Sequence, residues 1–386
     1  MTGRGPLAGR TVVELAGLGP APFACMAMAD LGAEVIRVDR PGPDNGPGAP
    51  SAADVLNRGK RSIVLDLKQP SAVDAVLTLC ESADVLVEGY RPGVAERLGL
   101  GPDVVAARNP ALVYGRMTGW GQDGPIANSA GHDIGYIAVT GALHAIGEAG
   151  GPPRIPLNLV GDFGGGATYL VIGILAGLLD ADRTGRGQIV DAAIVDGTSH
   201  LLAAIHSMLG SGRWVDERGA NLLDGGAPYY SVYETADGRH MAVGAIEPKF
   251  FAELLRLLDI GPAELDAAAQ QDRSAWPQHR ELFAARFRSR SRDEWTAVFD
   301  GTDACVAPVL SLREATDHPQ VAARGSVIET DGVVQPGTAP RFSAHPAGPP
   351  KPPPARGGDT AEILRRAGVD VDALLYTSAA FQNSDE

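Results

Sequence analysis

The chain has few cysteines and no long apolar segment, and each shortage excludes a class of protein. Its three cysteines, Cys25, Cys80 and Cys305, lie far apart and form no CxxC pair, which excludes the usual zinc patterns and argues against a disulfide scaffold. The longest apolar run, about residues 169–179, is shorter than the roughly 20 residues that span a bilayer, so we interpret it as a buried helix. The N-terminus lacks the apolar core of a signal peptide. We therefore expect a cytoplasmic protein that binds neither a metal ion nor a membrane.

Basic residues are also in short supply. Lys and Arg number 33 against 47 Asp and Glu, a net charge of −14, which argues against nucleic acid as the main partner because phosphate backbones require clustered cations. An anionic small molecule can still bind if a few basic side chains are placed locally. The length of 386 residues exceeds that of one typical core, so two domains are expected.

The first two hundred residues alternate strand and helix signals. Short runs rich in Val, Ile and Leu are separated by helical patterns such as FACMAMADLG and SAVDAVLTLCESA. This alternation predicts an α/β fold with a parallel sheet covered on both faces. A buried helix to about residue 182 is expected after GDFGGG. The predicted strands are TVVEL (11–15), EVIRVD (34–39), SIVLDL (62–67), DVLVEG (84–89), LVYGRM (112–117) and QIVDAAIV (188–195).

The pattern changes after about residue 225. YYSVYETADGRHMAVGAI (229–246) predicts a hairpin that turns at Asp237–Gly238, and helices are expected at 248–259 and 280–300. These elements indicate a smaller α+β domain. The Pro- and Gly-rich segment 336–358 predicts an extended tether, followed by a last helix, TAEILRRAG.

The first turn between strand and helix has two interpretations. Gly17 and Gly19 follow a strand, and Asp39 ends the next strand, as in a dinucleotide-binding fingerprint. Pro22, however, stands where the third glycine is required. A tight turn into a helix that begins with proline explains the same residues.

Two polar segments, GHDIGY (131–136) and GDFGGG (161–166), carry the candidate chemistry. His132 can be a structural histidine and Asp162 a helix N-cap. Alternatively, the helix start keeps Asp162 ionised, the glycines at 164–166 let a substrate approach the backbone, and an imidazole and a carboxylate flank one acidic carbon. Glu247 is either an ordinary residue before a helix or the carboxylate that orients His132.

Seven ordered blocks of sequence decide between these interpretations. They resemble the family III CoA-transferase superfamily and, within it, the α-methylacyl-CoA racemases, over about residues 7–376. The blocks are ELAGLGPAPFACMAMADLGAEVIRVDRPG, EGYRPGVAERLGLGP, MTGWGQDGP, GHDIGY, LNLVGDFGGG, GQIVDAAIVDG and GGAPYY…VGAIEP.

The resemblance implies an architecture. A large Rossmann-like, CoA-binding domain is expected at 1–192, completed by the C-terminal segment 337–386, with a linker at 193–230. A small α+β domain at 231–316 and a return linker at 317–336 follow. Two chains are expected to interlock as a homodimer, and coenzyme A enters as part of the substrate, with no other cofactor.

The resemblance also assigns roles to residues. His132 and Asp162 match the paired acid–base residues, and Glu247 matches the carboxylate that partners the histidine. Asn158 and Tyr230 match supports for Asp162. The expected contacts of the CoA thioester are Arg40, Leu65, Asp66, Leu67, Lys68, Gly89, Tyr90, Arg91, Arg97, Gly131, His132, Asp133, Ile134, Gly135 and Tyr136.

The function implied by the resemblance is the interconversion of (2R)- and (2S)-2-methylacyl-CoA thioesters by two-base proton transfer. A CoA-transferase that uses Asp162 as nucleophile stays open as the alternative, and a CoA-binding protein without catalysis is a third possibility. Gly135 departs from the asparagine of the racemase pattern GHDINY, which leaves the acyl preference open.

Overall fold

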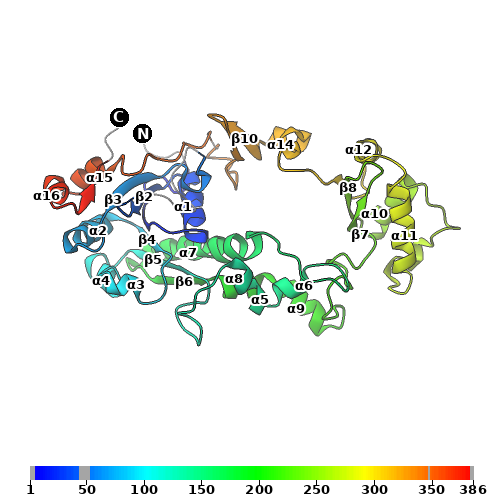
Figure 1. Ribbon diagram of the computed structural model, residues 1–386, viewed down its shortest axis with the longest axis horizontal. Coiled ribbons are helices and arrows are strands. Elements are labelled where there is room, and N and C mark those ends of the chain that lie inside the picture. The colour runs from blue at the N-terminus through cyan, green and yellow to red at the C-terminus, as the bar shows by residue number, and fades with distance from the viewer. Residues whose placement is uncertain (1–4, 43–52, 347, 383–386) are drawn as a thin grey trace. The chain divides into compact units, whose positions relative to one another are not determined.

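The computed structural model describes residues 5–42, 53–346 and 348–382, and its chain groups into two compact units (Figure 1). The first unit contains residues 1–140, 157–201 and 319–386, and the second contains residues 141–156 and 202–318. Segment 141–156 thus belongs to the second unit, although the expected large domain spans it. The domain boundaries given above stay a prediction.

A seven-stranded sheet forms the centre of the first unit, in the order β12-β3-β2-β1-β4-β5-β6. Six strands are parallel, and only β12 runs antiparallel to its neighbour β3. The expected parallel sheet is confirmed. Its strands are β1 (Thr11–Leu15), β2 (Glu34–Asp39), β3 (Arg61–Leu65), β4 (Val85–Glu88), β5 (Val113–Thr118), β6 (Ile189–Ala193) and β12 (Ala380–Phe381).

Both faces of this sheet are buried, which explains the nearly continuous apolar runs. Successive side chains of a strand point to opposite faces, so Val13 and Val12 belong to two different cores. The Val13 side is covered by α2 (Pro70–Ser82), α4 (Pro102–Arg108), α15 (Thr360–Arg366) and α16 (Val371–Tyr376). The Val12 side is covered by α1 (Pro20–Asp30) and α7 (Thr168–Thr184).

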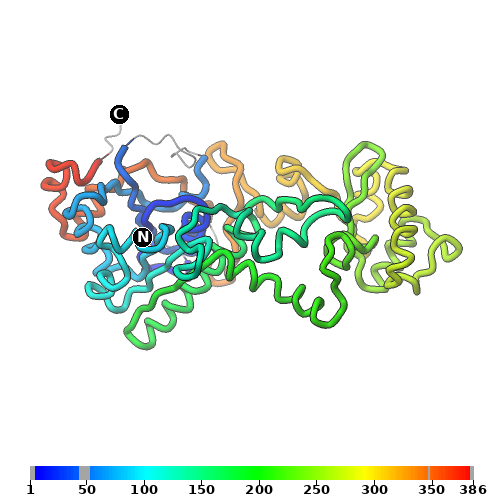
Figure 2. The backbone as a smooth tube through the Cα atoms, turned by 60° about the horizontal axis from the view of Figure 1, so that its bottom comes forward, coloured from blue at the N-terminus to red at the C-terminus, as the bar shows by residue number. Residues whose placement is uncertain are grey.

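The C-terminal segment returns to the beginning of the chain. Figure 2 shows the red C-terminal turns beside the blue N-terminal part of the first unit. There, Ala380 and Phe381 of β12 pair with Leu65 and Val64 of β3. Helix α15 confirms the predicted last helix, whereas α16 and β12 were not predicted. Residues 337–346 and 348–358 contain no helix or strand, after the short hairpin of β10 (Val327–Thr330) and β11 (Val333–Pro336).

The last two glycines of GDFGGG, Gly165 and Gly166, pack against a neighbouring helix. They lie in a π-helix, η2 (Leu159–Ala167), which contacts α8 (Ile194–Leu201). A Cβ on Gly165 would lie 2.5 Å from the Thr198 Oγ1 atom, and one on Gly166 would lie 3.0 Å from the Ile194 Cγ1 atom. The expectation that the glycines at 164–166 open the backbone to a substrate is therefore wrong for Gly165 and Gly166, because α8 fills the space beside them.

Helices η2 and α7 together form a run of 26 residues, Leu159–Thr184, that is long and apolar enough to cross a membrane by length and composition alone. The apolar run at about 169–179 is thus only part of a longer apolar helical segment, because η2 precedes it. Helix α7 nevertheless packs on the sheet through Leu170, Ile174 and Leu178, as the predicted buried helix should. The absence of a membrane partner stays a prediction.

The second unit has its own core around a three-stranded sheet. The predicted hairpin is confirmed, because β7 (Tyr230–Glu234) pairs antiparallel with β8 (His240–Gly244), which also pairs with β9 (Val306–Pro308). Aromatic side chains of α10 (Pro248–Leu257), α11 (Trp276–Phe287) and α12 (Arg292–Phe299) cover one face of this sheet.

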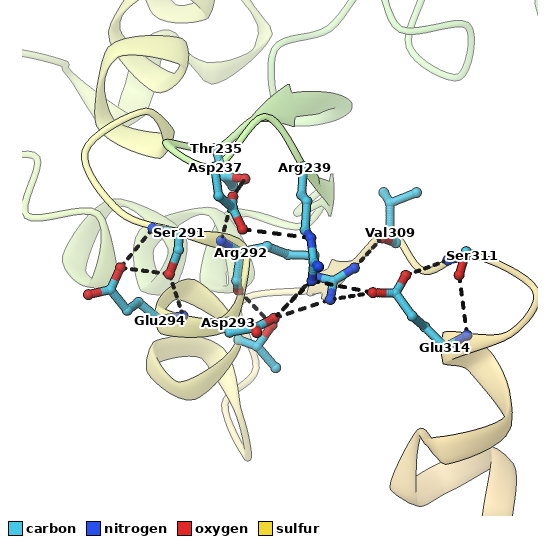
Figure 3. A network of polar contacts seen from close by, with 11 residues as sticks. Thr235, Asp237, Arg239, Ser291, Arg292, Asp293, Glu294, Val309, Ser311 and Glu314 are labelled. Atoms are coloured by element: carbon cyan, nitrogen blue, oxygen red, sulfur yellow. Dashed lines mark hydrogen bonds and ion pairs between the residues drawn. The ribbon is translucent and has the colours of Figure 1, made fainter.

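The helix predicted at 280–300 is interrupted. A capping box of Ser291 and Glu294 starts α12 separately from α11. Beside this cap, Arg292 donates to the Val309 carbonyl and forms an ion pair with Glu314 (Figure 3). These contacts join the last residues of the second unit to α12.

The remaining elements are short. They are η1 (Val55–Asn57), α3 (Val94–Arg97), α5 (Asp133–Val139), α6 (Ala142–Ala145), α9 (Ala203–Gly210), η3 (Ala267–Gln271), α13 (Glu314–Asp317) and α14 (Pro319–Arg324).

Candidate active site

A cavity of about 500 Å³ lies in the first unit at the carboxyl ends of β1, β4 and β5. Strand β1 pairs with β2 on one side and with β4 on the other, so the strand order reverses at this point. Ligands of open α/β sheets bind outside the carboxyl ends of the strands at such a reversal. The lining includes Gly19, Gly89–Pro92, Thr118–Trp120, Ser129–Asp133, Tyr136 and Asp162.

His132 and Asp162 both line this cavity, although 30 positions separate them in the sequence. His132 is the exposed residue just before α5, and Asp162 is half-buried in η2. The imidazole is close enough to act electrostatically on the carboxylate. The structure therefore brings the two polar segments to one place; their catalytic roles stay a prediction.

Asp133 joins the two segments through a hydrogen bond. Its Oδ1 atom accepts from the backbone N–H of Asp162 at 2.7 Å. The N–H groups at a helix start have no intrahelical partner, and here the first bond runs from the Phe163 N–H to the Asn158 carbonyl. Asp133, which belongs to α5, thus accepts from the Asp162 N–H, a donor that has no partner within η2. The sequence interpretation assigned Asp133 only to substrate contact.

Asp162 is not a helix N-cap, so the first of the two interpretations given for this residue is wrong. The N-cap position belongs to Asn158, whose side-chain Nδ2 lies 3.4 Å from the Asp162 Oδ2 atom. Burial raises the pKa of Asp162, and the nearby Asp133 carboxylate raises it further, whereas Asn158 and His132 lower it. The helix start therefore does not lower the pKa of Asp162, because desolvation outweighs the donors; the expected ionised state of this carboxylate stays a prediction.

The turn after β1 allows Asp162 to approach. Gly19 has φ 72° and precedes α1, and a Cβ at this position would lie 3.4 Å from the Asp162 Oδ2 atom. Helix α1 starts with Pro20, which confirms the tight turn into a proline-started helix. The Asp39 carboxylate accepts from the Arg37 and Ser62 side chains, so it is engaged within the protein.

A second cavity of about 450 Å³ lies in the same unit and contains the predicted basic contacts Arg40 and Lys68. Its lining also includes Leu65, Asp66 and Leu67. Tyr90 lines this cavity and the first one, and the Arg40 guanidinium lies 5.6 Å from the centre of its ring. The Tyr90 loop thus forms a wall shared by both cavities.

Some predicted residues lie elsewhere. Ile134 and Gly135 are outside the lining of the first cavity, and Arg97 on α3 is outside both linings. Glu247, exposed before α10, and Tyr230 on β7 belong to the second unit. Their predicted partnership with His132 and Asp162 stays untested.

Sequence reasoning missed part of the cavity wall. Trp120 and Ser129 line it, and Trp120 packs edge-on against Tyr136 at 4.7 Å between ring centres. Trp120 lies in the block MTGWGQDGP, whose aromatic residue between two glycines was the available signal. Within the described ranges, no group of three or more His, Cys, Asp or Glu residues could hold a metal ion.

The chain is similar to known proteins along nearly its whole length. A model of the CoA-transferase family III matches residues 7–360. The chain is 46% identical to human alpha-methylacyl-CoA racemase, over 97% of this chain and 96% of the human protein. It is 45% identical to the mouse alpha-methylacyl-CoA racemase, over 96% of this chain and 95% of the mouse protein. A solved CAIB/BAIF family protein from Brucella suis superimposes with a TM-score of 0.79 at 30% identity, covering 95% of this chain and 100% of that one. The chain therefore belongs to the CoA-transferase family III.

Proposed function

We propose that the protein is an isomerase that interconverts (2R)- and (2S)-2-methylacyl-CoA thioesters. The observation that carries this proposal is the meeting of His132 and Asp162 in one cavity at the reversal of the strand order. The human and mouse relatives that carry the name of this activity align along nearly the whole chain, which supports the assignment.

The reaction removes one proton from C2 of the acyl group and delivers another proton to the opposite face of the same carbon. His132 takes the proton from C2 of one enantiomer, and the electron pair of the broken C–H bond delocalises onto the thioester oxygen as an enolate. Asp162, in its protonated form, then delivers a proton to the opposite face of C2. The reverse direction starts with ionised Asp162 and protonated His132. Burial and the nearby Asp133 carboxylate raise the pKa of Asp162, which is the direction that a carboxyl group acting as a general acid requires.

The thioester is held by the two neighbouring cavities. We place the phosphates of CoA beside Arg40 and Lys68 and the thioester beside His132 and Asp162, with the chain between them passing the shared Tyr90 wall. Backbone N–H groups near Asp133 are proposed to stabilise the enolate oxygen. No cofactor is needed beyond the coenzyme A of the substrate.

A CoA-transferase is the second candidate, supported by the exposure of Asp162 to the cavity and by the family name. In this reaction, an Asp162 oxygen attacks the thioester carbonyl carbon and CoA thiolate leaves, which produces a mixed anhydride. The thiolate then attacks the aspartyl carbonyl, releases the first carboxylate and leaves CoA bound to the aspartate for the acceptor acid. His132 has no task in this scheme.

The assembly and location are also proposals. We infer an interlocked homodimer with a Rossmann-like large domain, in which Glu247 of one chain orients His132 of the other, in the cytoplasm. Exposed apolar side chains on η2, α7 and α8 of the first unit support a covered surface: Leu159 (57%), Ile172 (55%), Leu179 (73%) and Leu201 (49%). Light scattering of the active protein at low micromolar concentration should give the mass of a dimer, and an active monomer would contradict the proposal.

Isotope exchange separates the two candidate reactions. One pure enantiomer of a 2-methylacyl-CoA is incubated in heavy water without an acceptor acid. Two-base transfer incorporates deuterium at C2 while the opposite enantiomer accumulates, and His132→Ala and Asp162→Asn each slow this by about 10²–10⁴-fold. Transfer of CoA to an added free acid that survives His132→Ala, without labelling at C2, would establish the transferase instead.

A further inference from the structure

The loop that carries Tyr90 and Arg91 is held at both ends by one arginine. The loop follows β4 at Gly89 and leads into α3 at Val94. Tyr90 and Arg91 line the first cavity, and Tyr90 also lines the second. Any ligand that reaches from one cavity to the other therefore passes this loop.

Glu88 fixes the beginning of the loop. Its carboxylate is fully buried; Oε2 accepts from the Tyr90 backbone N–H at 2.6 Å, and Oε1 accepts from the Arg116 Nε at 3.0 Å. A buried carboxylate is stable only when its oxygens are paired. The Tyr90 backbone position consequently depends on Arg116, which neutralises Glu88.

The same arginine fixes the far end of the loop. The terminal nitrogens of Arg116 lie 2.9 Å and 3.3 Å from the two carboxylate oxygens of Glu96 on α3. This geometry is the bidentate fork that arginine forms and lysine cannot. The Arg116 side chain extends from β5, which pairs with strands on both sides, and is 9% exposed. The clamp that Arg116 forms with Glu88 and Glu96 is therefore anchored in the sheet.

We propose that Arg116 is a positioning residue for CoA-thioester binding, which holds the loop 89–93 in its binding conformation by joining Glu88 and Glu96. The inference rests on the proposed function, because it assumes that a CoA thioester lies along this loop. Arg116 lines neither cavity among the described residues. It acts through Tyr90 and Arg91, so its loss should weaken binding more than it slows proton transfer.

The test compares three variants by steady-state kinetics of C2 deuterium incorporation. Arg116→Met should raise the KM for a 2-methylacyl-CoA about tenfold, the effect of a lost hydrogen bond to a charged group, with kcat within about twofold. Glu96→Ala removes only the α3 side of the clamp and should raise KM by about two- to fivefold, less than Arg116→Met, because this carboxylate is 44% exposed. Arg108→Met is the matched control, since Arg108 also joins two carboxylates, Asp74 and Glu81, in the same unit.

Hydrogen exchange provides a readout that does not depend on activity. The Tyr90 amide should exchange faster in Arg116→Met than in wild type, while the amides of α2 keep their protection. A control Arg108→Met should leave both the KM and the Tyr90 exchange unchanged. An unchanged KM in a folded Arg116→Met, or an equal rise in Arg108→Met, would overturn the proposal.

The remaining outcomes are also decisive. If Arg116→Met does not fold, Glu96→Ala decides, because its exposed side chain can be removed without leaving a buried charge unpaired. Faster Tyr90 exchange with an unchanged KM would show a clamp without a role in binding, and the proposal falls. Wild-type protein without C2 exchange and without CoA binding would instead refute the proposed function, before any variant is compared.

Discussion

The Asp133 carboxylate accepts a hydrogen bond from the backbone N–H of Asp162 at 2.7 Å, and this contact has two effects. It anchors the start of η2 beside α5, and it brings a second negative charge close to the Asp162 side chain. The second effect adds to burial in raising the pKa of Asp162. In the proposed reaction Asp162 must both accept and deliver a proton, and a raised pKa is the direction that delivery of a proton requires.

Replacing Asp133 by Asn should therefore shift the pH dependence without removing the anchor. An amide oxygen can still accept from the Asp162 N–H, but the charge that raises the pKa of Asp162 is gone. The acidic limb of the kcat/KM profile for C2 deuterium incorporation should move to lower pH. An unmoved limb, with the variant folded, would show that Asp133 does not act on Asp162 electrostatically.

Asn158→Ala should move the same limb in the opposite direction. The Asn158 amide donates to the Asp162 Oδ2 and lowers the pKa of Asp162 against the effect of burial. Without this donor the pKa rises further, so the acidic limb should move to higher pH. The comparison with Asp133→Asn is informative because each variant removes one neighbour of the same carboxyl group. Shifts of equal sign would contradict one of the two assignments, and the direction of the shift shows which one.

The sheet was predictable because burial on both faces leaves a clear record in the sequence. β1 and β2 occupy the residues 11–15 and 34–39 that the apolar runs indicated. β12 was not predictable, since it has two residues and exists only by pairing with β3. The start of η2 at Leu159 was missed for a related reason. Its glycines have low helix propensity, and the helix is stabilised by packing against α8, which local sequence does not reveal.

The site was predictable only in part. The resemblance placed His132 and Asp162 together, and the cavity contains both. An aspartate at the first position of α5 looks like an ordinary acidic residue of a first helical turn. Its bond to a residue 29 positions away depends on the packing of α5 against η2. Tertiary contacts of this kind, and not residue types, distinguish Asp133 from a surface acid.

Asp162→Asn should make the protein more stable at neutral pH while it lowers activity. The pKa of Asp162 is raised in the folded state, so the folded chain binds this proton more tightly than the unfolded chain does. Stability is therefore lost as pH rises from the unfolded pKa through the folded pKa. Asn has no such ionisation. The gain in unfolding temperature should be full above the folded pKa and vanish below about pH 4, the unfolded value for Asp. A gain that is independent of pH would contradict this origin.

Arg40→Ala and Lys68→Ala should each weaken CoA binding by about tenfold, because an acidic protein requires local cations to hold phosphates. Both side chains line the second cavity. Titration calorimetry with free CoA measures this effect, and each variant should also reduce the salt dependence of binding. Arg183→Ala, on the exposed side of α7, is the control that should change neither. Unchanged affinity in both cavity variants would show that the CoA phosphates bind elsewhere.

Gly165→Ala should destabilise the protein by about 1–3 kcal/mol, the range for overpacking a filled space. The new methyl group would lie 2.5 Å from the Thr198 Oγ1 atom and 2.7 Å from the Thr198 backbone nitrogen. Backbone atoms of α8 cannot move aside cheaply, so η2 and α8 must separate, and Asp162 moves with η2. Gly135→Ala is the matched control in α5. Nothing lies within 4 Å of its added Cβ, and the better helix propensity of Ala should stabilise the protein by about 0.5–1 kcal/mol. Thermal unfolding of the two variants should therefore shift in opposite directions. Equal shifts would mean that GDFGGG keeps its glycines for a reason other than contact with α8.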